Sequence, residues 1–207
     1  MDTATRDGNA NEVQRIISVG TVDINGVLGN TGRTILCWAA EKGQTELVRL
    51  LLERNADPSK PGEVGYSTLH YAANNGHNDV VELLLDGGAH LDIKPEFGRT
   101  PLILAAGEGN KEVVKVLLDR GAEIDKKDDN GRTPLLCSAF SRCKEVIQVL
   151  LDRGADPVKT NNGGQTPLSM ARIRALCPHP HAYEAITADW EIVKMMEDEI
   201  AKRGQRD

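Results

Sequence analysis

Apolar residues recur along this chain in short blocks with helical spacing. The first block, Glu46-Leu-Val-Arg-Leu-Leu-Leu, has apolar residues at positions i, i+1, i+3, i+4 and i+5, which predicts a helix with one broad buried face. The pattern returns 33 residues later at Asp79, and again at Glu112 and Glu145. Each block opens with an acid, which suits the positive end of a helix dipole. The sequence therefore predicts one such helix in every 33 residues.

A shorter helix is predicted before each of these blocks. Its threonine suits an N-cap, and the proline that follows in three copies suits the first helical turn, where a missing N–H costs nothing. A pair of small residues, Ala39-Ala40 in the first copy, then allows neighbouring copies to approach closely. The start of this helix is marked by segments of the type Gly-Arg-Thr-Pro-Leu, which begin at Gly32, Gly65, Gly98, Gly131 and Gly164.

Turns are expected after both helices. Glycine should end the shorter helix in a left-handed conformation at Gly43, Gly76 and Gly109. Arg142 stands in this place in the fourth copy, so we expect the turn there to be more strained or longer. The longer helix should end at Asn55-Ala-Asp and at the Gly-Ala pairs that replace it in later copies.

The two ends of the chain depart from the repeat, as capping units do. We expect a single domain over residues 1–207, with an N-terminal capping unit at 1–31 and four full repeats at 32–163. A C-terminal capping repeat at 164–207 carries an insertion near residues 176–188, because the expected apolar block is delayed to Glu191-Ile-Val-Lys-Met-Met. The chain thus contains about six units.

Ser67-Thr-Leu-His70-Tyr-Ala-Ala resembles the Thr-Pro-Leu-His-x-Ala-Ala signature of the ankyrin repeat family. The resemblance covers roughly Thr5 to Lys202 and implies an all-α solenoid of stacked helix–turn–helix units with projecting hairpin loops. Only the second repeat keeps the family's histidine, so we expect one hydrogen-bonding group to be lost in each other repeat, at a cost to local order. The replacing residues are Cys37, Ile103, Leu136 and Ser169.

Composition excludes several classes of function. The chain has 25 Lys and Arg against 31 Asp and Glu, a net charge of −6, and no basic segment, which disfavours nucleic-acid and anionic-membrane partners. No apolar run approaches the ~20 residues of a membrane span, and the first residues lack a signal peptide's apolar stretch. The scattered cysteines suit a reducing compartment. We expect an intracellular, cytoplasmic or nuclear, monomer.

No catalytic or phosphate-binding motif is visible, so we expect neither an enzyme nor a cofactor. Cys177-Pro-His179-Pro-His181 offers three residues that bind zinc in other proteins. A fourth ligand is not evident, and a proline-stiffened surface loop without metal is the favoured interpretation.

The resemblance implies that partners contact the hairpin tips, such as Asn30, Thr31, Glu63 and Val64, and the exposed face of the shorter, inner helix. Five of the seven aromatic residues map to this surface, and aromatic side chains often carry binding energy. As an alternative, the rings of the inner helices pack between neighbouring helices. One repeat offset is shared by Trp38, Tyr71, Leu104, Cys137 and Met170, which should form a stripe.

The function predicted is a non-enzymatic scaffold that binds a partner protein in an aromatic-lined concave groove. Acids outnumber bases on this surface, which favours a partner with basic groups. For the arginines after each glycine, bracing between adjacent hairpins is the favoured interpretation. The alternative is a small-molecule-binding protein or a cofactor-free enzyme that uses the same groove and its carboxylates. The predicted partner-binding residues are Trp38, Glu41, Tyr66, Tyr71, Asn74, Phe97, Arg99, Leu104, Glu108, Arg132 and Phe140.

Overall fold

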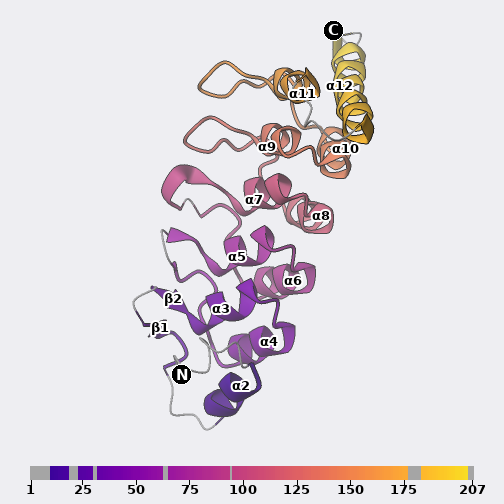
Figure 1. Ribbon diagram of the computed structural model, residues 1–207. Coiled ribbons are helices and arrows are strands. Elements are labelled where there is room, and N and C mark those ends of the chain that lie inside the picture. The colour runs from indigo at the N-terminus through magenta and orange to yellow at the C-terminus, as the bar shows by residue number, and fades with distance from the viewer. Residues whose placement is uncertain are drawn as a thin grey trace. The chain divides into compact units, whose positions relative to one another are not determined.

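The computed structural model describes residues 10–18, 23–29, 32–62, 65–93, 95–176 and 183–204. These residues form short α-helices joined by turns and loops, as the repeat predicts (Figure 1). The chain divides into two compact units, residues 1–96 and residues 97–207, each of which is described by itself.

The first unit contains one helix, a short hairpin and two pairs of helices, each pair with one inner and one outer helix. The inner helix α3 packs on α5, and the outer helix α4 packs on α6. A small antiparallel hairpin pairs Val27 with Thr34 and leads into α3. The elements are α2 (Ala10–Ser18), β1 (Val27–Leu28), β2 (Arg33–Thr34), α3 (Ile35–Glu41), α4 (Thr45–Glu53), α5 (Thr68–Asn74) and α6 (Asn78–Asp86).

The second unit repeats the same two-layer arrangement. The inner helices α7, α9 and α11 pack in succession, as do the outer helices α8, α10 and α12, and the loops project from the inner layer (Figure 1). The elements are η2 (Glu96–Gly98), α7 (Pro101–Glu108), α8 (Lys111–Asp119), α9 (Pro134–Phe140), α10 (Lys144–Asp152), α11 (Pro167–Leu176) and α12 (Tyr183–Gly204).

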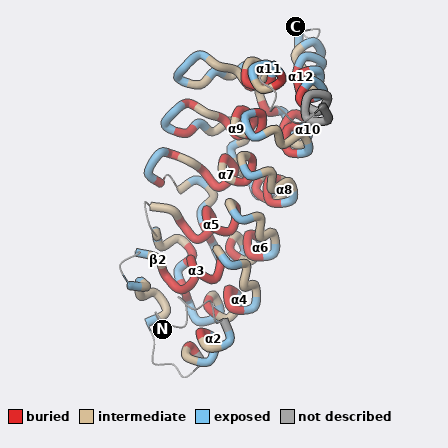
Figure 2. The backbone as a smooth tube through the Cα atoms, in the orientation of Figure 1, coloured by how far each residue is buried: buried red, intermediate tan, exposed pale blue. Residues whose placement is uncertain are grey.

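Small and branched apolar side chains fill the space between the helices. Figure 2 shows buried stretches along the inner and outer helices and exposed residues in the loops. The small pairs of the inner helices are fully buried, as Ala39 and Ala40 in α3 and Ala105 and Ala106 in α7 illustrate. The core therefore rests on close helix–helix approach rather than on large rings.

The predicted N-caps are present at the inner helices. Thr133 accepts a hydrogen bond from the backbone N–H of Leu136 at 3.2 Å, and His70 Nδ1 accepts one from the backbone N–H of Ser67 at 3.1 Å. The loss of this second bond in every other repeat was expected, and that expectation is wrong for Ser169. Its Oγ accepts from the backbone N–H of Thr166 at 2.9 Å, because a short hydroxyl reaches the same donor.

The turn at Arg142 is strained but not longer than its equivalents. Its φ is 62°, close to the 65°, 74° and 79° of Gly43, Gly76 and Gly109. Three residues separate α9 from α10, the same number as between α5 and α6. A side chain in this conformation costs about 1 kcal/mol, and the contacts of Arg142 described below offset that cost.

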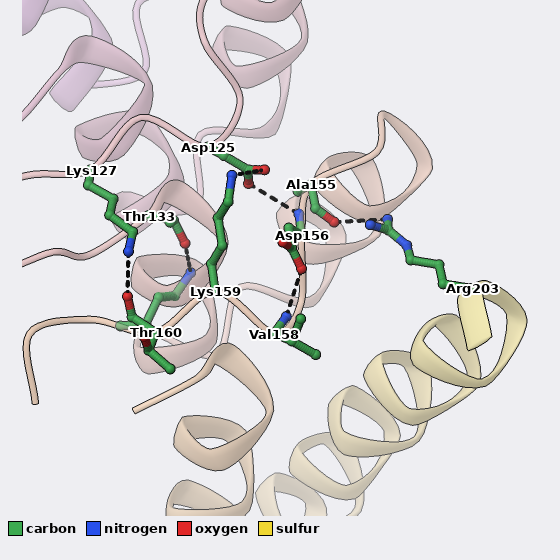
Figure 3. Close-up of polar contacts among 10 residues, drawn as sticks. Asp125, Lys127, Thr133, Ala155, Asp156, Val158, Lys159, Thr160 and Arg203 are labelled. Atoms are coloured by element: carbon green, nitrogen blue, oxygen red, sulfur yellow. Dashed lines mark hydrogen bonds and ion pairs between the residues drawn. The ribbon is translucent and has the colours of Figure 1, made fainter. Parts of the chain in front are cut away.

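Polar contacts join the loops of successive repeats in the second unit (Figure 3). Asp125 accepts from the Lys159 ammonium at 2.9 Å and from the backbone N–H of Asp156 at 3.1 Å. Lys127 donates to the carbonyl oxygen of Thr160 at 2.7 Å. These bonds fix the spacing of the loops beside the inner helices.

The last helix, α12, is longer than the others and begins at Tyr183, inside the insertion predicted near residues 176–188. Residues 177–182 lie outside the described part of the chain. The Arg142 guanidinium contacts the Asp189 carboxylate at 3.0 Å, and the Asp189 side chain is only 4% exposed. Arg203 donates to the carbonyl oxygen of Ala155 at 2.9 Å (Figure 3). The buried ion pair ties α12 to the turn before α10.

We predict that Thr133→Ala lowers the free energy of unfolding by about 1 kcal/mol, because it removes the side-chain acceptor at the start of α9. Thr133→Ser keeps that oxygen and should unfold close to the wild-type urea concentration. Urea unfolding followed by circular dichroism measures both. Equal destabilisation by the two variants would show that the methyl group, not the cap, matters.

We predict that Arg142→Met lowers the free energy of unfolding by about 3 kcal/mol, because it leaves the buried Asp189 carboxylate without its partner. The matched control is Lys144→Met, which removes an exposed pair with Glu191 and should change stability little. Adding Asp189→Leu to Arg142→Met should restore part of the loss in the same urea experiment. A double variant less stable than Arg142→Met would contradict this account.

Candidate functional site

A groove of about 420 Å³ opens to solvent on the second unit. Its walls come from the inner helices α7, α9 and α11 and from the loops before them. The lining residues are Arg99, Ile103, Leu104, Gly107, Glu108, Arg132, Leu136, Cys137, Phe140, Ser141, Asn161, Gln165 and Met170.

The floor of this groove is apolar because the repeat brings equivalent positions together. Leu104, Cys137 and Met170 occupy the same offset in three successive repeats and all line the groove. Leu104 and Cys137 are partly exposed, whereas Met170 is buried. Three of the five positions of the predicted stripe are thus together in one open site.

Phe140 stands at the rim of the groove, and the residue is 51% exposed. The guanidinium of Arg174 lies over its ring, 3.9 Å from the ring centre, in a cation–π contact. Arg174 follows Phe140 by about one repeat, a relation that the sequence register contains but that our predicted site omitted. The prediction also missed Ile103, Leu136 and Asn161, which line the groove. Their positions within the repeat are not those from which we predicted partner contacts.

Arg132 both braces its loop and lines the groove. Its Nε donates to the carboxylate of Asp128 at 2.8 Å, and Asp128 is buried. Asp128 also accepts from the backbone N–H groups of Asn130 and Arg132 at 2.9 and 2.8 Å. The bracing expected from sequence was between adjacent hairpins, whereas Arg132 braces its own loop, and the pair with Asp128 fixes where the guanidinium lies.

The thiol of Cys137 is uncharged at neutral pH. Burial raises the pKa of Cys137 to about 11, and the opposing effects of the nearby Arg132 and Arg99 are smaller. A protonated thiol is a poor nucleophile. Cys137 therefore presents an uncharged, weakly polar thiol to the groove.

Two of the rings predicted to bind in the first unit are buried, and Tyr66 is partly exposed. Trp38 is 8% exposed and Tyr71 is 7% exposed. The Arg33 guanidinium lies 4.8 Å from the centre of the Tyr71 ring, and Arg33 is held at 3.0 Å by the Glu41 carboxylate. Tyr66 and Tyr71 form a T-shaped ring pair, with 6.1 Å between ring centres. The packing alternative fits Trp38 and Tyr71 better than direct contact with a partner.

Two other predicted residues lie apart from the groove lining. Asn74, at the end of α5, is partly exposed. Phe97 is 56% exposed and has a φ of 71°, a conformation that costs a bulky residue about 1–2 kcal/mol. A strained and exposed ring is a candidate for function, because neither packing nor backbone preference favours it there.

The zinc candidates Cys177, His179 and His181 lie outside the described residues, as do Asn30, Thr31, Glu63 and Val64. Within the described residues, no three His, Cys, Asp or Glu side chains gather in a way that could hold a metal ion. None of the helices described is both long and apolar enough to cross a bilayer.

We predict that iodoacetamide alkylates Cys137 in the folded chain about a hundredfold more slowly than in the chain unfolded in urea. The reason is that a pKa near 11 leaves about one thiol in a thousand as thiolate at pH 8. Peptide mapping by mass spectrometry reads this site separately from the other cysteines. The alkylation rate of the folded chain should rise with pH as long as the chain stays folded. Equal rates in the folded and the unfolded chain would contradict a raised pKa for Cys137.

Comparison with known proteins agrees with the repeat architecture. A family model for ankyrin repeats in three copies matches residues 69–161, and one for ankyrin repeats in many copies matches residues 36–85. Acyl-CoA-binding domain-containing protein 6 of Xenopus tropicalis is 41% identical over 51 residues, which are 25% of this chain and 18% of that protein. The chain therefore matches less than a fifth of this relative's length. With its 33-residue period, its capped helix pairs and these matches, the chain belongs to the ankyrin repeat family.

Proposed function

We propose that this chain is a non-enzymatic interaction module, monomeric, whose groove on residues 97–207 binds a segment of a partner protein. Ankyrin repeats generally mediate protein–protein interaction. The observation that carries the proposal is the open groove of about 420 Å³, with an apolar floor and the half-exposed Phe140 ring at its rim. Exposed aromatic side chains next to a pocket are typical binding hot spots.

The groove suits a partner that arrives as an extended segment. Its walls are helices that are held in place by their N-caps and by neighbouring helices. Little conformational entropy of the groove is therefore lost on binding. Of the predicted partner-binding residues, Arg99, Leu104, Glu108, Arg132 and Phe140 line this groove. We assign the direct contacts to these five. Phe97 is kept as a further contact, because its ring is exposed.

The remaining predicted residues have a different role in this proposal. They belong to the first unit, where the charged pair and the packed rings leave little area for a partner. We assign them to the framework of that unit rather than to the binding surface. The residues are Trp38, Glu41, Tyr66, Tyr71 and Asn74.

The small-molecule or cofactor-free enzyme alternative has less support. A ligand site usually encloses most of its ligand, and this groove is open to solvent. Its thiol is protonated at neutral pH because the pKa of Cys137 is raised to about 11. The name of the frog relative refers to acyl-CoA binding, but the match covers 18% of that protein and gives no support for that ligand here.

The test uses the full chain and a phage library of short random peptides. Peptides selected on the immobilised chain are synthesised and titrated into protein labelled with 13C at the methionine methyl groups. We expect the Met170 methyl signal to shift, because Met170 lines the groove, whereas the Met196 signal, from a buried position on α12, stays in place.

The matched variants are Phe140→Ser and Val158→Ser, which remove similarly exposed apolar side chains at 51% and 54% inside and outside the groove. Phe140→Ser should weaken peptide binding at least about tenfold, the effect of one hot-spot ring. Val158→Ser should bind like the wild type. The proposed function would be refuted if no selected peptide shifted the Met170 signal of the wild-type chain. It would also be refuted if the selected peptides bound Phe140→Ser as tightly as the wild type.

A further inference from the structure

We infer that the segment bound in the groove of residues 97–207 is acidic, with a carboxylate beside an apolar side chain. The inference rests on the proposed function and adds the chemistry of the partner. It reverses the expectation from sequence, in which a surplus of acids on the inner surface favoured a basic partner.

The charges that line the groove are mainly positive, although the whole chain carries −6. Arg99 and Arg132 are on its wall, and Arg174 lies against Phe140 at its rim. Glu108 is the acid among the lining residues. A segment with basic residues would bring like charges together along most of this wall, which is unfavourable.

Of the acids counted from sequence, Glu108 lines the groove, whereas others lie in the first unit or outside the described residues. Glu41 pairs with Arg33 in the first unit at 3.0 Å, and Glu63 lies outside the described residues. Asp128 is buried under Arg132 and its oxygens accept hydrogen bonds from within its own loop. Glu41 is therefore not part of the charge of the groove, whereas Asp128 offsets part of the positive charge of Arg132.

Arg132 is held in a position to receive an acceptor. A guanidinium carries five N–H donors, and Asp128 engages the Nε and Nη2 side at 2.8 Å. The side chain remains 30% exposed, so its other donors face solvent or a bound segment. A guanidinium fixed in this way loses little entropy when it binds a carboxylate.

Arg174 and Phe140 together form the part of the groove that would receive an acidic residue and its apolar neighbour. The guanidinium is stacked 3.9 Å from the ring centre, and the carbonyl oxygen of Arg174 accepts from Arg142 at 3.1 Å. A cation and an apolar ring are thus presented side by side. The complementary feature on a partner is an acid next to a leucine, a methionine or an aromatic residue.

The peptides selected on the full chain provide the test, because their sequences are read directly. We expect peptides that shift the Met170 methyl signal to be enriched in Asp and Glu beside a large apolar residue. Replacing those acids by Asn and Gln should weaken binding, and raising the salt concentration should weaken the acidic peptide more than its neutral counterpart.

The chain variants are Arg99→Gln and Arg174→Gln, each expected to raise the Kd of the acidic peptide about fivefold. The matched control is Arg153→Gln, an arginine of the same unit that pairs with Asp119 on the outer helices and should leave the Kd unchanged. Arg132 is left intact in these experiments. Its loss would leave the buried Asp128 carboxylate without its ion-pair partner and would destabilise the fold.

Several outcomes would overturn the inference. Groove-dependent peptides enriched in Lys and Arg, or in uncharged residues, would do so while leaving the proposed function standing. The inference would also fail, and the proposed function stand, if the Arg99→Gln and Arg174→Gln variants bound the acidic peptide as tightly as Arg153→Gln while Phe140→Ser still weakened binding. A single-stranded RNA that shifts Met170 more strongly than any peptide would replace the partner class. Failure of every peptide to use the groove refutes the proposed function itself.

Discussion

The packing of each short helix against its neighbours is the contact on which the rest of this structure depends. The inner helices α3, α5 and α9 have 7 residues each, and the outer helices α4, α6, α8 and α10 have 9. Helices shorter than about 12 residues are marginal alone in water. Each therefore depends on its neighbours, and in the inner helices alanine pairs such as Ala105-Ala106 let the next helix approach closely. The same contacts make the inner helices a firm wall for the groove.

Much of the framework was predictable because it depends on residues close in the sequence. A threonine cap needs only the next turn of helix, and Thr133 and Leu136 form it as expected. A left-handed turn needs only a residue that tolerates it, and Gly109 adopts it. The Leu104, Cys137 and Met170 positions followed from the period itself. These features repeat, so one copy predicts the others.

The remaining features depend on side chains that belong to a single repeat. Trp38 and Tyr71 share the offset of Leu104, yet they are buried, as Met170 is. At Tyr71, the guanidinium of Arg33, held by Glu41, lies over the ring. Arg142 adopts the left-handed conformation that glycine has in the other repeats. Its partner Asp189 comes from α12, whose position in the sequence does not follow the 33-residue period. The register locates such residues but does not say which neighbour reaches them.

The division between packed and open inner surface determines where this chain can bind. In the first unit Trp38 and Tyr71 are buried, whereas in the second unit Leu104 and Cys137, at the same offset, are partly exposed in a groove with Phe140 and arginines beside them. A crystal structure of the full chain with a selected peptide tests this most directly. The account predicts the peptide against α7, α9 and α11, with an apolar side chain on Phe140. A peptide seated instead on Trp38 and Tyr71, or on the outer helices, would contradict it.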